Sequence, residues 1–172
     1  QQGIDTSRFK PANSKFRIPN SKFRILFLGR IAPVKNIDVL LRAVEIIKDS
    51  SLVQLTIVGS PKPDNPTEIE HYEKIKKMTE ELGIKNLVEF RPSVPNSQTP
   101  VIYNEHDLFA NLTPTGSFDK TTLEAMACGL PVIGTAVGGI KDFLKDRETG
   151  LAAKTDDPID LSSKIKLLIE QF

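Results

Sequence analysis

Short apolar runs alternate with longer amphipathic segments along most of the chain. The runs are rich in β-branched residues and lack polar alternation, which is typical of strands buried on both faces. The sequence predicts six such strands, at Arg24–Gly29, Leu52–Gly59, Leu87–Phe90, Asp107–Leu112, Pro131–Thr135 and Thr149–Ala153. Apolar residues that recur every three or four positions predict helices at Asn36–Asp49, Thr67–Leu82, Thr121–Cys128 and Pro158–Glu170.

Strands that alternate with helices in this way predict a parallel sheet with helices on both faces. We therefore expect an α/β fold, a Rossmann-like doubly wound sheet of about six strands. Ligands of such sheets bind in the loops that follow the carboxyl ends of the strands. Candidate chemistry is therefore sought in the loops after Gly29, Gly59, Phe90 and Leu112.

The first 23 residues differ in composition from the rest of the chain. They hold two prolines among polar residues, and the sequence NSKFRI occurs twice, at Asn13–Ile18 and Asn20–Ile25. Only the second copy leads into an apolar run. We expect residues 1–23 to form an N-terminal linker segment outside the folded core, and residues 24–172 to form one Rossmann-like domain.

Composition narrows the class of protein without naming it. The 172 residues include 23 Lys and Arg against 22 Asp and Glu, a net charge of +1, which gives no general case for nucleic acid as a partner. The sequence has no run of roughly 18 uncharged apolar residues that would predict a membrane span. A single cysteine, Cys128, cannot form an internal disulfide and fits a reducing compartment. These features argue against a disulfide-rich secreted scaffold and an integral membrane protein, and we expect a cytoplasmic location.

The loop after the first strand carries Gly29, Arg30 and Lys35. A glycine at a strand end lets a ligand approach the backbone closely. The two cations are spaced to reach a pair of phosphates, Arg as a fork and Lys as a point charge. The competing interpretation is two solvated surface cations. Gly59 precedes a proline-rich loop and offers a second close approach, although an ordinary surface turn is the simpler explanation there.

The segment between residues 113 and 128 holds most of the candidate chemistry. Gly116 and Ser117 predict a small-residue turn, and Asp119 or Thr121 can cap the helix that follows. Free amides at a helix N-terminus, with the helix dipole behind them, suit a diphosphate. Further donors at this helix start are the side chains of Lys120, Thr121 and Thr122.

Glu124 lies about one turn inside this helix. From there a carboxylate can accept hydrogen bonds from two hydroxyls of a ribose. The competing interpretation is a capping box, in which Thr121 caps the helix and Glu124 bonds back to the cap. Spacing alone favours the capping box, and both interpretations stay open at this point.

The other reactive side chains predict no site. His71 and His106 have no second His or Cys at metal-ligand spacing, so we expect surface histidines and no metal. Cys128 ends an apolar helix face and is expected to be a packed thiol. The sequence lacks the P-loop motif and has no G-x-G-x-x-G after the first strand, which argues against a P-loop ATPase and a nicotinamide dehydrogenase.

Taken together, the motifs resemble the C-terminal, nucleotide-sugar-binding domain of a two-domain GT-B glycosyltransferase of the retaining family 4, the group 1 glycosyl transferases. The resemblance covers nearly the whole chain. It rests on Gly3–Pro11 (GIDTSRFKP), Gly29-Arg30 with Lys35 and Leu40-Leu41, Leu55–Gly59 (LTIVG), Leu123–Ile133 (LEAMACGLPVI), and Gly138-Gly139 with Thr149–Leu151.

The resemblance implies a role for each motif. Arg30 and Lys35 would hold the diphosphate of the donor and Glu124 its ribose hydroxyls, and these three are the expected catalytic residues. The segment Glu89–Val94 would place backbone against the nucleobase. The full set of implied donor-binding residues is Gly29, Arg30, Lys35, Gly59, Arg91, Gly116, Ser117, Phe118, Asp119, Lys120, Thr121, Thr122 and Glu124.

The resemblance also implies partners. The donor would be a UDP- or GDP-linked sugar, bound without a metal ion or other cofactor, and a hexosyl unit would pass to a glycan or lipid-linked acceptor. In this family the acceptor site belongs to an N-terminal domain. We therefore expect the present chain alone to be inactive or nearly so, and the whole enzyme to associate peripherally with a membrane.

One residue departs from the family pattern at an important place. Gly116 stands where the first of two paired glutamates, the one that meets the donor sugar, is usual. We interpret this as a change in the sugar contacts. Alternatives are a non-catalytic nucleotide-sugar-binding module, an epimerase of the same architecture and, last, an unrelated dinucleotide-binding fold. Asn36 also replaces the usual glycine after Lys35.

Overall fold

The computed structural model describes residues 3–12, 21–114, 120–142 and 144–171. Within them, six parallel strands form one sheet: β1 (Phe23–Leu28), β2 (Val53–Val58), β3 (Val88–Arg91), β4 (Leu108–Asn111), β5 (Val132–Thr135) and β6 (Leu151–Ala153). The strand order is β3-β2-β1-β4-β5-β6, which is that of a Rossmann-like doubly wound sheet. The predicted fold class is confirmed.

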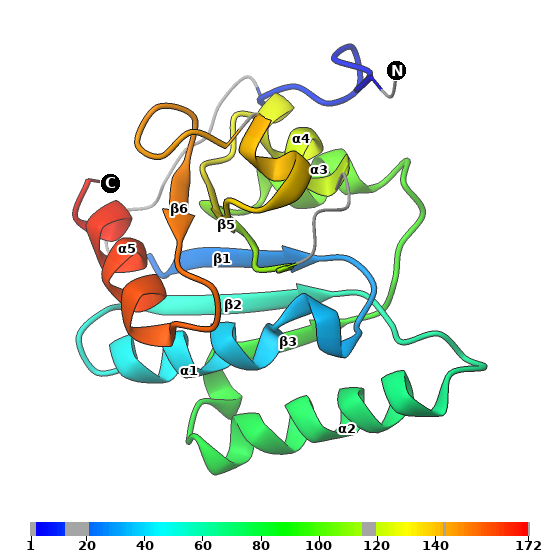
Figure 1. Ribbon diagram of the computed structural model, residues 1–172, viewed down its shortest axis with the longest axis vertical. Helices are drawn as coiled ribbons and strands as arrows, with labels where there is room; N and C mark the ends of the chain where they lie inside the picture. The colour runs from blue at the N-terminus through cyan, green and yellow to red at the C-terminus, as the bar shows by residue number, and fades with distance from the viewer. Residues whose placement is uncertain (1–2, 13–20, 115–119, 143, 172) are drawn as a thin grey trace.

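Helices cover both faces of this sheet (Figure 1). One face carries α1 (Ile37–Ile47), α2 (Pro66–Glu81) and α5 (Pro158–Glu170), and the other carries α3 (Thr99–Asn104) and α4 (Lys120–Ala127). Short 3₁₀ segments lie at Pro33–Lys35, Lys85–Leu87 and Gly138–Asp142. The predicted strands and helices are confirmed to within two residues at each end. The sequence pattern does not predict α3, because its 6 residues are too few to show a helical period.

The central strand β1 shows why the strand segments are continuously apolar. Ile25 and Phe27 belong to a core cluster shared with the inner sides of α1, α2 and α5. Leu26, which lies between them, belongs to a second cluster under α3 and α4. Because successive side chains of a strand face opposite sides, a strand covered on both faces needs apolar residues at every position.

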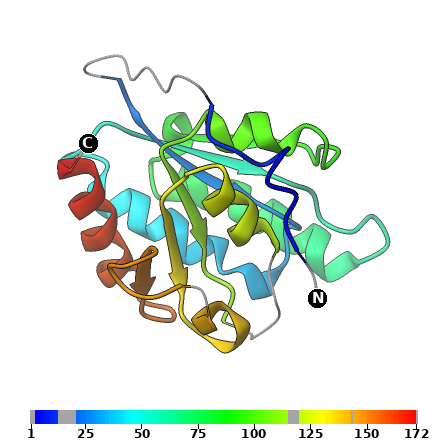
Figure 2. The ribbon, with the colours of Figure 1, turned by 90° about the horizontal axis from the view of Figure 1, so that it is seen from above.

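The described N-terminal residues 3–12 pack against the second cluster, on the side of α3 and α4 (Figure 2). Phe9 is only 4% exposed, and its ring centroid lies 6.3 Å from that of Tyr103 on α3. The backbone N–H of Ala12 donates to Asn104 Oδ1 at 2.8 Å. The expectation that the first residues lie outside the core is therefore wrong at Phe9, because a single aromatic residue among polar ones gives no periodic signal. Phe23, which we assigned to the linker, opens β1, and the first NSKFRI copy lies outside the described residues.

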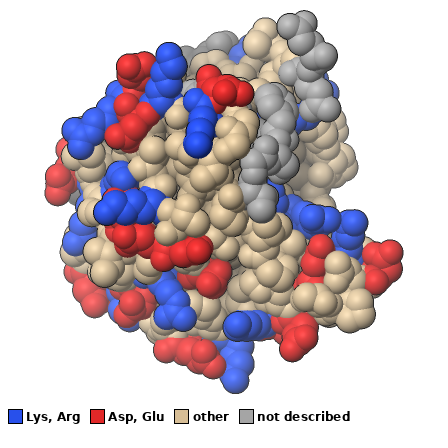
Figure 3. All heavy atoms as spheres, in the orientation of Figure 1, with Lys and Arg blue, Asp and Glu red and all other residues tan. Residues whose placement is uncertain are grey.

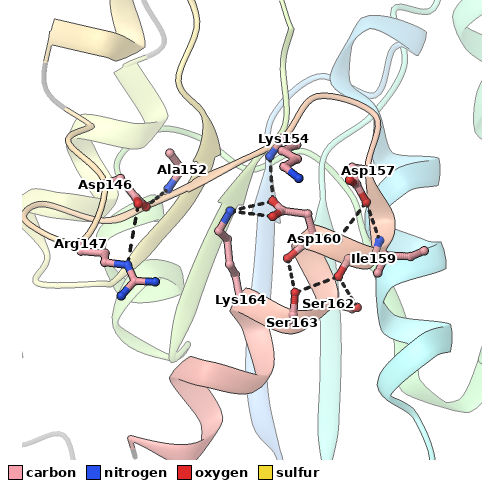
Figure 4. Close-up of polar contacts among 10 residues, drawn as sticks. All are labelled: Asp146, Arg147, Ala152, Lys154, Asp157, Ile159, Asp160, Ser162, Ser163 and Lys164. Carbon is pink, nitrogen blue, oxygen red and sulfur yellow. Dashed lines mark hydrogen bonds and ion pairs between the residues drawn. The ribbon is translucent and has the colours of Figure 1, made fainter.

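A polar network fixes the start of α5 (Figure 4). The N-cap is Asp157, whose Oδ1 accepts from the backbone N–H groups of Ile159 and Asp160 at 3.1 and 2.9 Å. The Asp160 carboxylate accepts from Lys164 Nζ at 2.7 Å and from the backbone N–H of Lys154 at 2.9 Å. Burial acts to raise the pKa of Asp160, but these hydrogen bonds outweigh it and lower the pKa. The network joins the helix start to the end of β6.

Charges of both signs are interspersed over the face of the molecule in Figure 3. Several pair along α2, among them Lys76 with Glu73 at 2.7 Å and Lys77 with Glu81 at 3.4 Å. Such exposed pairs contribute little to stability, roughly 0–1 kcal/mol each. In the part of the chain that the structure describes, no helix is both long and apolar enough to cross a membrane.

Candidate functional site

The strand order reverses at β1. From β1 the chain first adds β2 and β3 on one side, and then returns to add β4, β5 and β6 on the other. Ligands of doubly wound sheets bind in the crevice at such a point, outside the carboxyl ends of the strands. The loops that follow Leu28 and Asn111, the last residues of β1 and β4, flank this crevice.

Gly29 and Gly59 bring the loops after β1 and β2 into backbone contact. The Gly29 N–H donates to the Val58 carbonyl at 3.0 Å. Gly59 has a φ of +155°, and a Cβ at this position would overlap the carbonyl oxygen of Gly29, so only glycine fits. A pocket of about 220 Å³ opens beside this contact, lined by Leu28, Gly29, Arg30, Val58, Gly59, Ser93 and Val94.

Arg30 lines this pocket and is restrained by a buried carboxylate. Its Nε lies 3.6 Å from Oε1 of Glu68, whose side chain is 7% exposed against 45% for that of Arg30. The second carboxylate oxygen of Glu68 accepts from the backbone N–H of Lys62, in the loop after β2, at 2.9 Å. Glu68 lies in the first turn of α2, where the N-cap Asn65 accepts from its N–H at 3.2 Å. The buried Glu68 carboxylate thus pairs with the Arg30 guanidinium, and about half of the Arg30 side chain stays exposed to solvent.

Lys35 reaches across the crevice to the loop after β4. Its Nζ donates to Thr113 Oγ1 at 3.3 Å. The Thr113 hydroxyl in turn donates to Asn111 Oδ1 at 2.9 Å, and Asn111 Nδ2 donates to Thr122 Oγ1 on α4 at 2.8 Å. Thr113, Asn111 and Thr122 are 2%, 4% and 0% exposed. A buried chain of hydrogen bonds therefore joins this cation to the first turn of α4.

The turn that carries Lys35 ends in a left-handed residue. Asn36 has a φ of 49° and a ψ of 40°, a conformation that asparagine adopts more readily than most residues. Its Nδ2 donates to Oδ1 of Asp156, in the loop before α5, at 2.7 Å. Because this position needs a left-handed backbone conformation, asparagine can replace the glycine that the family resemblance suggested.

Glu124 turns toward α3 rather than back toward the start of its own helix. Its two oxygens accept from the Tyr103 hydroxyl at 2.9 Å and from Asn96 Nδ2 at 3.2 Å, and the residue is 6% exposed. Helix α4 begins at Lys120, so Thr121 lies inside it. The capping-box interpretation of Thr121 and Glu124 is therefore wrong, because the Glu124 carboxylate accepts hydrogen bonds from Tyr103 and Asn96 instead.

Arg91 contributes to the site through its main chain. Its carbonyl accepts from the Gly59 N–H at 3.0 Å. Its guanidinium donates to both oxygens of Glu89 at 3.0 Å and to Glu105 at 3.4 Å. The hydrogen bonds between Glu89 and Arg91 lower the pKa of the carboxyl and raise that of the guanidinium. The side chain is thereby paired outside the pocket, which Ser93 lines instead.

The remaining predicted residues belong to the segment before and at the start of α4. Gly116, Ser117, Phe118 and Asp119 lie outside the described residues. Lys120 is exposed, Thr121 is half-buried, and the Thr122 hydroxyl lies inside the buried hydrogen-bond chain. The structure therefore brings Gly29, Arg30, Lys35, Gly59, Thr122 and Glu124 to the carboxyl-end side of the sheet.

The histidines differ from the sequence expectation. His106 is 3% exposed, with Nδ1 2.7 Å from the Ile102 carbonyl oxygen. It is not a surface residue, because it lies two residues before β4, which pairs with β1 in the middle of the sheet. His71 is half-buried on α2. Cys128 is a buried thiol outside any disulfide, as predicted. Within the described ranges, no group of three or more His, Cys, Asp or Glu side chains is placed to hold a metal ion.

Five residues that shape the site escape the sequence analysis: Glu68, Asn96, Tyr103, Asn111 and Thr113. Glu68 follows Asn65 at capping-box spacing, which marks the helix start but not the ion pair. Asn111 and Thr113 are polar residues at the end of a buried strand, and that is a usable signal. The other two give none, because their contacts with Glu124 join positions 28 and 21 residues apart.

The arrangement combines two kinds of binding group. Arg30, Lys35 and the amide end of α4 attract anions. Glu124 adds a carboxylate that accepts hydrogen bonds from hydroxyl groups. A molecule that carries both phosphate and neighbouring hydroxyl groups matches this combination.

Sequence comparison assigns the chain to a family. Residues 9–171 match the family described as glycosyl transferases group 1. A D-inositol 3-phosphate glycosyltransferase of Thermomonospora curvata is 31% identical over an alignment 185 residues long. The alignment covers 98% of this chain and 42% of that protein. The present chain thus spans less than half the length of this curated relative.

Solved structures share the fold. The C-terminal domain of LpcC, a glycosyl transferase group 1 family protein of Francisella tularensis, has a TM-score of 0.85 at 22% identity, covering 98% of this chain and 88% of that one. HepE of Anabaena in complex with UDP-glucose has a TM-score of 0.84 at 20% identity, covering 98% and 46%. Identities this low establish the fold alone. The family match, however, extends over most of the sequence, and the chain belongs to the glycosyl transferases group 1 family.

Proposed function

We propose that this chain is the donor-binding part of a retaining glycosyltransferase. It holds a nucleoside-diphosphate sugar, from which a hexosyl unit passes to a glycan or lipid-linked acceptor. The observation that carries the proposal is the placement of α4. Its first turn is linked to Lys35 through Thr113, Asn111 and Thr122, and one turn further on it carries the nearly buried Glu124.

Each part of a nucleoside diphosphate then has a partner. Arg30, Lys35 and the amides at the start of α4 receive the two phosphates, and Glu124 receives the ribose hydroxyls. The pocket beside Gly59 and Ser93 receives the base against main-chain groups. These positive groups stabilise the charge that develops on the departing diphosphate, so we expect no metal ion to be needed.

The names of similar proteins support this assignment. HepE was solved with UDP-glucose, and the curated relative is a D-inositol 3-phosphate glycosyltransferase. That relative is more than twice as long as the present chain, since the match covers 42% of it. We infer that an additional N-terminal domain supplies the acceptor site, and that the present chain alone transfers little or no sugar.

A second candidate is a binding module without catalytic activity. Gly116 favours it, because the resemblance places there a carboxylate that meets the donor sugar. Both candidates share the nucleotide site, so turnover by the full-length protein decides between them. We further propose a cytoplasmic location, with peripheral membrane contact of the whole enzyme. The single cysteine, Cys128, cannot form an internal disulfide, which fits a reducing compartment.

Calorimetric titration with UDP, GDP and ADP, and with their sugar conjugates, tests the proposal. We expect one nucleoside diphosphate to bind with micromolar to millimolar affinity. Arg30→Ala and Glu124→Ala should each weaken binding by about tenfold or more, the value of a hydrogen bond to a charged group. Arg42→Ala is the matched control, because Arg42 is exposed on α1. Binding that both site variants leave unchanged would overturn the proposal.

A further inference from the structure

We propose that the N-terminal segment positions Glu124 for recognition of ribose, and that Asn96 is the positioning residue through which it acts. The inference rests on the proposed function and goes beyond it. It starts from the two side chains that hold the Glu124 carboxylate, Tyr103 and Asn96, which come from α3 and from the loop before it.

The orientation of the Asn96 side chain is set by its neighbours. Arg8 Nη2 donates to Asn96 Oδ1 at 2.6 Å and to the Asn96 backbone carbonyl at 2.8 Å. A guanidinium has donors only, so the amide oxygen of Asn96 has to face Arg8. The amide nitrogen then faces Glu124, to which it donates at 3.2 Å. Arg8 therefore dictates that Asn96 presents a donor, and not an acceptor, to the carboxylate.

The neighbouring residue of the same segment supports the second donor. Phe9 lies next to Arg8, is 4% exposed and packs against the ring of Tyr103 with 6.3 Å between ring centroids. The Tyr103 hydroxyl donates to Glu124 at 2.9 Å. Two consecutive residues of the N-terminal segment thus each contact one of the two side chains that hold the carboxylate.

This arrangement has a consequence for the bound ligand. An ionised carboxylate offers about four acceptor positions on two oxygens, and one donor on each oxygen fixes its plane. The positions that stay open then point in fixed directions, which suits the paired hydroxyls of a ribose. Without the Asn96 donor the carboxylate can rotate, so the hydroxyl contacts weaken while the phosphate contacts of Arg30 and Lys35 persist.

The test compares each nucleoside diphosphate with its 2′-deoxy counterpart. We use whichever of UDP, GDP and ADP binds the wild-type chain, and measure the ratio of the two dissociation constants by calorimetry. Asn96→Asp keeps an acceptor for Arg8 but removes the donor to Glu124, and Asn96→Ala removes both. We expect each to reduce the preference for ribose by roughly tenfold, the weight of a charge-assisted hydrogen bond. Arg8→Ala should reduce it in the same direction by a smaller factor.

Asn104→Ala is the matched control. Asn104 also ties the N-terminal segment to α3, since its Oδ1 accepts from Ala12 N–H at 2.8 Å and its Nδ2 donates to the Lys10 carbonyl at 3.1 Å. Asn104 hydrogen-bonds to Ala12, Lys10 and Pro100, and not to Glu124. A merely structural role of these contacts predicts that Asn96 and Asn104 variants behave alike, with an unchanged ribose preference.

The outcomes separate this inference from the proposed function. If the wild type prefers ribose, Glu124→Ala abolishes the preference and the Asn96 variants keep it, the positioning role is wrong and the donor site stands. If the wild type binds no nucleoside diphosphate, or binds both forms equally, the role assigned to Glu124 fails and the inference fails with it. Circular dichroism and thermal unfolding of each variant confirm that the measured chains are folded.

Discussion

The environment of His106 determines its protonation. Nδ1 lies 2.7 Å from the Ile102 carbonyl, and because a carbonyl only accepts, this nitrogen carries the proton in the neutral ring. Burial is the main cause that lowers the pKa of His106, and the nearby guanidinium groups of Arg91 and Arg24 act in the same direction. The hydrogen bond to Ile102 and the charge of Glu105 oppose the shift without reversing it. The folded state therefore favours the neutral imidazole.

This lowered pKa makes stability depend on pH. The unfolded chain binds a proton more readily than the folded chain, so the free energy of unfolding should fall as the pH drops from about 7 toward 5, through the ordinary histidine pKa. His106→Gln should flatten that dependence in urea-unfolding measurements across this range. Burial also lowers the pKa of His71, but this residue is only half-buried, so His71→Gln should flatten the dependence less than His106→Gln does. An unchanged slope in His106→Gln would contradict the assignment.

At the scale of elements, the start of α5 shows how the local sequence stabilises the end of a helix. Asp157 caps α5 with two backbone hydrogen bonds, and Pro158 follows at the first helical position. An acceptor at the cap followed by proline is a favourable start for a helix. Helix α5 in turn packs against α1, so its start also places the loop that holds Asn36 through Asp156.

Asp157→Ala should lower the free energy of unfolding by about 1 kcal/mol, because the two N–H groups lose their acceptor. Asp157→Asn keeps a capping oxygen and should retain most of the stability. Chemical denaturation of the two variants measures the difference. Equal stability of the Ala and Asn variants would show that the cap adds nothing.

The elements themselves could be predicted from the sequence, because buried parallel strands and amphipathic helices leave clear periodic patterns. The loops after Gly29 and Leu112 were also found, since polar residues and glycines at strand ends stand out. What could not be predicted is which side chains meet. Glu124 fits a capping box by spacing, and only the folded chain shows that Tyr103 and Asn96 take it instead.

The whole molecule is a sheet with a core on each face, and the N-terminal segment belongs to one of them. The cluster under α1, α2 and α5 holds most of the large apolar residues. The cluster under α3 and α4 is smaller and includes Phe9. A residue near one end of the described chain thus helps to close the core under α3 and α4, behind the proposed donor site.

Phe9→Ala should therefore destabilise the fold by about 3–5 kcal/mol, the usual cost of removing a buried aromatic side chain. Lys10→Ala, an exposed neighbour, is the control and should change stability by less than about 0.5 kcal/mol. Thermal and denaturant unfolding report both values. A Phe9 variant as stable as the Lys10 variant would mean that the segment only rests on the surface.

The contact between Gly29 and Gly59 also restricts how such a site can diverge over evolutionary time. A side chain at position 59 would have to displace the loop after β1, because it would overlap the Gly29 carbonyl. Substitutions in the loop after β1 and in the loop after β2 are therefore expected to change together. The loop after β3 meets them partly through a single replaceable hydrogen bond, from the Ser93 N–H to Ser60 Oγ at 3.2 Å. On the proposed function, new donor preferences are therefore expected to arise in the loops after β3 and β4, while the loops after β1 and β2 are inherited together.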